Sequence, residues 1–108
     1  MLINETRLQK ALTYLAETDE PAAELRANVE RHEFNAKAVR DAVFLHSTGT
    51  VAERTALAGT HDNYIQAMNA YFEALRLSDA MRNKRSTETI VIDTWRSLNS
   101  GRNKGNIT

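Results

Sequence analysis

A long apolar seam is the sequence feature that most constrains the fold. Apolar residues and two histidines recur at alternating spacings of four and three, as in a heptad repeat. The seam consists of Leu25, Val29, His32, Ala36, Val39, Val43 and His46. This spacing predicts a helix that starts near Pro21 and ends near His46, with Pro21 in the first turn, where its missing N–H has no partner to lose.

The length of this helix raises a packing problem. About 25 residues of helix span about 37 Å, whereas a compact domain of about 100 residues has a radius of gyration near 13 Å. The helix must extend beyond its own domain while its seam stays apolar to the end. We therefore expect another copy of the chain to cover the seam in a homo-oligomer. A hairpin with another helix of the same chain is the alternative, and a hairpin combined with self-association would satisfy both.

Other segments are also typical of helices. Asn4 suits the N-cap of a first short helix, which the segment at 17–21 ends. Gly49 suits a left-handed position after the seam helix, and Thr50 with Glu53 forms a capping box that starts a short helix ending near 59–60. A second long helix starts near His61 and carries an apolar stripe formed by Ile65, Met68, Phe72 and Leu75, which Met81 extends.

The last third of the chain leaves two alternatives open. Residues 82–87 contain no apolar side chain, so they form either a solvated helix segment or a loop. Residues 90–92 are β-branched and could form a short strand, but the spacing of Ile90, Val91, Trp95 and Leu98 favours a helix. We thus predict an all-α fold, an elongated helical bundle of four to five helices with two long ones. One helical domain is expected over residues 1–101 and a flexible basic tail over 102–108.

Composition excludes several classes of protein. The 108 residues include no Cys, one Pro and four Gly, which excludes disulfide frameworks and thiolate zinc sites and disfavours folds of many short strands. No apolar run approaches the length of a membrane span, and the first ten residues lack the apolar stretch of a signal peptide. We expect a soluble protein of the cytoplasm without membrane partners.

Catalytic and cofactor motifs are missing. The three histidines form no H-x-x-x-H pair, and the chain contains neither a phosphate-binding P-loop nor a dinucleotide-binding glycine motif. No pair of carboxylates stands on an apolar background. The sequence therefore predicts a protein that is not an enzyme and that uses no cofactor or metal.

The net charge of zero conceals an asymmetry. Residues 1–75 contain 7 Lys and Arg against 11 Asp and Glu, and residues 76–108 contain 7 against 3. A basic end of this kind is typical of polyanion binding, although the acidic and basic parts could instead attract each other within one chain or between copies. The candidate phosphate contacts are Arg82, Lys84, Arg85 and Arg96, and Trp95 is either a base-stacking residue or an anchor of the core.

The segment from Arg85 to Gly101 resembles the C-terminal segment of the UvsY-type phage recombination mediators. The similarity lies in the spacing of Arg85, Ile92, Trp95-Arg96, Leu98 and Gly101. Upstream, the order of a basic helix, an apolar pair and Ser/Gly also resembles the family. Here these positions are Lys37, Arg40, Phe44-Leu45, Ser47 and Gly49, followed by a long helix with Tyr71 and Leu75. The resemblance extends over residues 36–101.

This resemblance implies a helical, self-associating protein that binds single-stranded DNA and needs no cofactor. Such mediators assist a recombinase alongside single-strand binding protein, and this short chain could instead serve an annealing protein. The family also implies a second DNA contact at Lys37 and Arg40. We therefore expect a phage recombination accessory protein in the host cytoplasm. The alternative is a helical protein–protein adaptor or structural phage component, whose basic end docks acidic partner surfaces.

Overall fold

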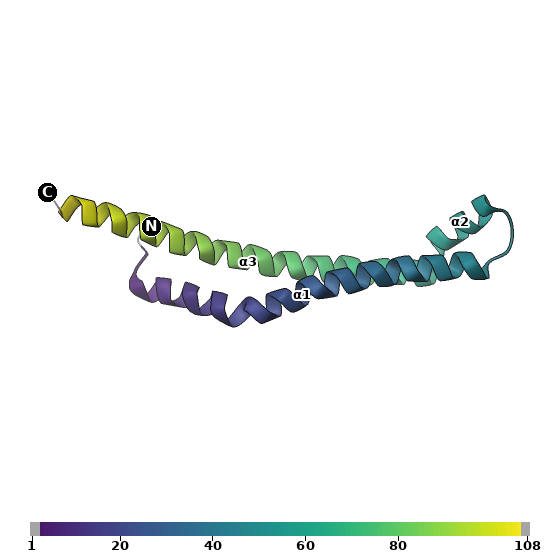
Figure 1. Cartoon of the computed structure of the whole chain (residues 1–108), viewed down its shortest axis with the longest axis horizontal. Coiled ribbons are helices and arrows are strands. Elements are labelled where there is room, and N and C mark those ends of the chain that lie inside the picture. The colour runs from purple at the N-terminus through teal and green to yellow at the C-terminus, as the bar shows by residue number, and fades with distance from the viewer. Residues whose placement is uncertain (1–2, 107–108) are drawn as a thin grey trace. The chain divides into compact units, whose positions relative to one another are not determined.

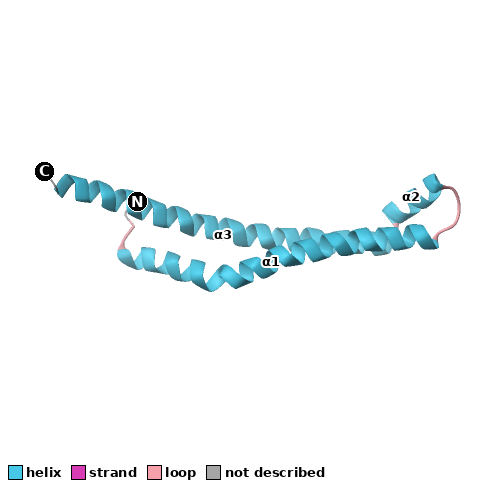
Figure 2. Cartoon of the chain, viewed as in Figure 1, coloured by secondary structure: helices cyan, strands magenta, loops and turns pink. Residues whose placement is uncertain are grey.

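A computed structural model describes residues 3–106 of the chain, which form three helices (Figures 1 and 2). Helix α1 extends over Glu5–His46, α2 over Val51–Thr60 and α3 over Asp62–Asn106. The described residues contain no strand, which confirms the all-α prediction. The predicted count of four to five helices is wrong, because segments expected to be separate are continuous.

Helix α1 joins the two helices that the sequence predicts on either side of residue 21. Pro21 lies inside α1 instead of starting a new helix. Proline in a helix removes the N–H that would bond to the carbonyl four residues earlier, here that of Glu17. The neighbouring Glu and Ala residues favour helix and keep the segment helical in spite of this loss. A single weakened turn therefore replaces the predicted break.

Helix α3 resolves both alternatives that the sequence leaves open. Residues 82–87 are helical, and residues 90–92 form helix and not strand. The helix also continues through Gly101 to Asn106, where the sequence predicts the start of a flexible tail. Residues 107 and 108 lie outside the described residues, and the mobility of the tail stays a prediction.

The ends of the helices follow the predicted capping chemistry. The Arg7 N–H donates to Asn4 Oδ1 at 2.8 Å, and the Glu53 N–H donates to Thr50 Oγ1 at 3.1 Å, which confirms both N-caps. The Glu53 carboxylate accepts from the Thr50 hydroxyl at 3.2 Å, where the capping box predicts a bond to the Thr50 backbone amide. Gly49 has φ +116°, a conformation that L side chains rarely adopt, so glycine is required at this turn.

Contacts divide the chain into two compact units. Unit 1 combines the chain up to Ala22 with the chain from Ala80 onward, and unit 2 consists of Ala23–Asp79. The first boundary lies between Ala22 and Ala23, within one turn of Pro21, where α1 lacks one backbone hydrogen bond. The prediction of one domain over residues 1–101 stays a prediction.

Unit 1 has a small core between the first part of α1 and the last part of α3. Ala11, Val91 and Ile92 are buried, and three partly buried side chains, those of Ile3, Leu8 and Leu15, pack against them. Two polar contacts reinforce this core. The Arg7 guanidinium bonds Glu88 at 2.7 and 2.8 Å, and the Tyr14 hydroxyl donates to Met81 Sδ at 3.7 Å. Unit 1 is thus held by few apolar residues and several cross-helix polar contacts.

Unit 2 has a core of alanines. Ala36, Ala58, Ala67 and Ala74 are buried, so α1, α2 and α3 approach one another through small side chains. The seam from Leu25 to Val43 is buried or half-buried, and only its last member, His46, is exposed. The hairpin alternative therefore explains the cover of the seam, and no second copy is needed there.

The large apolar side chains remain in contact with water. The most exposed are Phe34 at 74%, Leu45 at 71% and Val51 at 69%, and no large side chain among the described residues is fully buried. Soluble single chains rarely leave so many large apolar side chains uncovered over so small a core. The exposed apolar surface thus lies on the outer faces of the helices and not on the seam.

Candidate nucleic-acid interface

The residues that the sequence assigns to DNA binding lie in both units. Lys37 and Arg40 belong to α1 in unit 2, and the remaining five belong to α3 in unit 1, namely Arg82, Lys84, Arg85, Trp95 and Arg96. The described part of the chain therefore contains two separate candidate patches, one in each unit.

Arg85 crosses from α3 to α1. Its Nη1 donates to the Leu15 carbonyl at 2.9 Å and to Thr18 Oγ1 at 2.6 Å, and its Nη2 bonds Asp19 at 2.7 Å. Only 24% of the side chain is exposed. With three hydrogen bonds to α1, Arg85 joins the helices of unit 1 and is less available to a phosphate than a fully exposed cation.

The other α3 cations do not share one face. Residues two apart on a helix point in nearly opposite directions, so Arg82 and Lys84 lie on different sides of α3. Arg96 follows Arg82 by about four turns and shares its side, where it also lies 3.7 Å from Asp93. A single strand that follows α3 can therefore meet Arg82 and Arg96 on one side, or Lys84 on the other.

Trp95 is half-buried, and its assignment as a base-stacking residue or as an anchor of the core stays a prediction. It lies one turn after the buried Val91. A half-buried indole retains some surface in contact with solvent.

The patch in unit 2 is exposed and partly neutralised. Lys37 Nζ lies 3.5 Å from Glu33 on the same helix. The Arg40 guanidinium lies over the Tyr64 ring of α3, 5.9 Å from its centroid. Sequence reasoning does not identify Tyr64, because only the packing of α3 on α1 brings it beside Arg40.

Arg54 is a second residue that sequence reasoning does not identify. Its guanidinium donates from Nε and Nη2 to the Phe44 carbonyl at 3.1 and 2.9 Å and stacks on the Phe44 ring, 4.2 Å from the centroid. The Ser47 hydroxyl donates to the same carbonyl at 2.8 Å. These bonds satisfy a carbonyl in the last turn of α1 and hold α2 beside it. No short motif in the sequence signals this contact.

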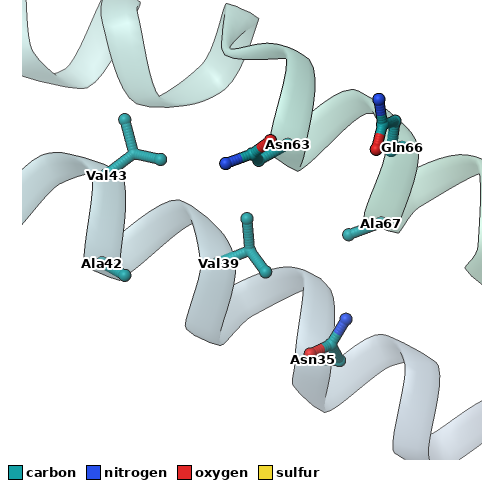
Figure 3. Close-up of a pocket in the computed structure, with 7 residues that line it drawn as sticks. All are labelled: Asn35, Val39, Ala42, Val43, Asn63, Gln66 and Ala67. Carbon is teal, nitrogen blue, oxygen red and sulfur yellow. The ribbon is translucent and has the colours of Figure 1, made fainter.

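A groove between α1 and α3 in unit 2 carries no charge. It has a volume of about 470 Å³ and is lined by Asn35, Val39, Ala42, Val43, Asn63, Gln66 and Ala67. Figure 3 shows Val39 and Asn63 turned toward the space between the two helices. The groove is lined by apolar side chains and by the side-chain amides of Asn and Gln. It therefore offers no cation to a phosphate.

Ion pairs within unit 1 link the two oppositely charged parts of the sequence. Arg85 pairs with Asp19, and Arg7 pairs with Glu88. The hydrogen bond with Arg7 lowers the pKa of Glu88, and the same bond raises the pKa of Arg7. Of these two pairs, only Arg85–Asp19 joins a cation of the basic part to an acid of the acidic part, because Arg7 belongs to the acidic part and Glu88 to the basic part.

The Glu88 contact makes stability depend on pH. Because the pKa of Glu88 in the folded chain lies below its ordinary value of 4.5, the contact stabilises the fold above about pH 4.5 and is lost as the pH falls through the lowered pKa. We expect the thermal unfolding midpoint to fall below pH 4.5 and Glu88→Gln to flatten this part of the curve. Exchange of the exposed Glu20 for Gln serves as the control. A Glu88→Gln curve with the wild-type slope contradicts the contact.

The described residues contain neither a membrane-spanning helix nor a metal-binding cluster. None of the helices combines the length and apolar character needed to cross a bilayer. No group of three or more His, Asp or Glu side chains within residues 3–106 is placed to hold a metal ion. Comparison of the chain with known protein families, with curated proteins and with solved structures found no match.

Proposed function

We propose that this chain is a non-enzymatic helical protein that self-associates and, as an oligomer, binds single-stranded DNA as an accessory to a recombinase or annealing protein. The observation that carries the proposal is the set of large apolar side chains left in water on both units, above all Phe34, Leu45 and Ile90. Covering them requires a partner, and a second copy is always present. The role beside a recombinase rests on the resemblance of residues 36–101 to the UvsY-type mediators.

Self-association also supplies what one chain lacks for DNA binding. The candidate patches of one copy hold few exposed cations, namely Lys37, Arg40, Arg82, Lys84 and Arg96. Among these, Lys37 and Arg96 have a carboxylate nearby. Single contacts of this kind are weak. Repetition around an oligomer raises the effective concentration of each further contact and turns weak contacts into useful affinity.

Anisotropy of labelled oligo-dT, measured across a salt series, tests the proposal. We expect binding at low salt and a negative slope of log affinity against log salt. Lys84→Gln and Lys37→Gln should each weaken binding and reduce the magnitude of this slope by about 0.7 per lost contact and copy. Because both side chains are exposed, the variants should retain the wild-type unfolding midpoint. Absence of binding at low salt contradicts the DNA-binding role.

A protein–protein adaptor is the second candidate, and the pairing of cations with carboxylates favours it. Arg85 is hydrogen-bonded to α1, Lys37 lies near Glu33 and Arg96 lies near Asp93. The positive electrostatic potential at the candidate site is therefore weaker than the sequence suggests. An adaptor of this kind would dock acidic protein surfaces, such as the acidic tail of a single-strand binding protein. An oligomer that binds an acidic peptide and not oligo-dT would favour this second function.

A further inference from the structure

The outward face of α1 in unit 2 carries the two most exposed large apolar side chains of the described chain, Phe34 and Leu45. Ala36, which is 2% exposed, marks the side of α1 that is covered within the chain. Residues advance by about 100° along a helix, so Phe34 and Leu45 lie about half a turn from Ala36. Ala27 and Ala38 fall on the same outward face. We call the residues Ala27, Phe34, Ala38 and Leu45 the outer stripe.

The outer stripe has a palindromic spacing. Its members follow one another at intervals of seven, four and seven residues, and a small side chain alternates with a large one. When a second α1 runs in the opposite direction and is centred on position 36, its Leu45 lies at the level of Ala27 and its Ala38 at the level of Phe34. A second α1 that runs antiparallel therefore sets each large side chain against an alanine.

Charges beside the outer stripe favour the same direction. Arg31 and Asp41 lie five residues on either side of position 36 and flank the stripe, and Arg31 also bonds Glu24 at 2.8 Å and Asn28 at 2.7 Å on its own helix. In the antiparallel arrangement, Arg31 of one copy lies at the level of Asp41 of the other. A parallel arrangement in register instead places Arg31 at the level of Arg31, Asp41 at the level of Asp41 and Phe34 against Phe34. Both size and charge thus select the antiparallel pair.

We propose that two copies of this chain pair antiparallel through their outer stripes, around a two-fold axis at the level of position 36. The proposal rests on the self-association in the proposed function and adds the face, the direction and the register. Residues 27–45 span about 27 Å of helix, so this contact lies at the small end of specific interfaces. It forms a weak dimer alone or one of the contacts in a larger oligomer.

Size-exchange variants test the register. Sedimentation at micromolar concentration should show Phe34→Ala and Ala38→Phe each raising the dissociation constant at least about tenfold, through a lost and a clashing contact respectively. In the double variant Phe34→Ala/Ala38→Phe, the large side chain at position 38 of one copy again faces an alanine, at position 34 of the other copy. This variant should recover much of the affinity. Phe72→Ala, on α3 of the same unit, is the control, because Phe72 is also exposed but lies outside the stripe. All the substituted side chains are exposed, so the variants keep the fold.

Disulfide trapping tests the direction, because the chain contains no Cys. Under oxidising conditions, a mixture of Ala27→Cys and Leu45→Cys proteins should yield a disulfide-linked dimer, and each protein alone should not. Cross-linking of Leu45→Cys alone overturns the antiparallel arrangement. An oligomer that is unaffected by the Phe34 and Ala38 variants overturns the stripe and leaves the proposed function standing. A monomer at all concentrations overturns both.

Discussion

Replacing Ala11 by Leu is expected to lower the free energy of unfolding by about 1–3 kcal/mol. Ala11 is 0% exposed and lies in the core of unit 1 with Val91 and Ile92. The larger side chain has no space there, so it must push the two helices apart or adopt a strained rotamer. Thermal or denaturant unfolding followed by circular dichroism measures the change.

Ala16 provides a matched control for this variant. It lies on the same helix but is exposed, so Ala16→Leu should change the free energy of unfolding by no more than about 0.5 kcal/mol. Equal stability of Ala11→Leu and Ala16→Leu would show that α1 does not pack on α3 through Ala11.

Replacing Arg85 by Ala is expected to lower the free energy of unfolding by about 2 kcal/mol. The guanidinium supplies three bonds to α1, at Leu15, Thr18 and Asp19, and is one-quarter exposed. Arg85→Lys keeps the charge but loses the planar fork that reaches three acceptors, so it should recover only part of the loss.

Lys84 separates the structural role of Arg85 from DNA contact. Lys84→Ala removes an exposed cation next to Arg85 and should leave unfolding unchanged. If Arg85 contacts phosphate instead, Arg85→Ala weakens oligo-dT binding and leaves the unfolding midpoint at its wild-type value. That pair of results would contradict the cross-helix role.

The candidate site could be predicted from the sequence only in part. Clusters of Lys and Arg are visible in a sequence, but whether each side chain is free to bind a phosphate is not. Glu88 and Asp19, for example, lie far along the chain from the arginines that they bind. The same holds for Tyr64 beside Arg40 and for Arg54 on the Phe44 carbonyl. Contacts between distant residues depend on how the helices pack, and no local pattern encodes them.

The sequence by itself determined the helical class, the N-caps at Asn4 and Thr50 and the turn at Gly49, because these depend on side chains within a few residues of one another. Only the tertiary structure decided that the seam of α1 is covered within its own chain and that Phe34 and Leu45 face water. A helical repeat shows which residues share a face, but it does not show which face meets a neighbour. That choice follows from the packing of α1 and α3 through small alanines, which allows a close approach on one side and leaves the large side chains on the other.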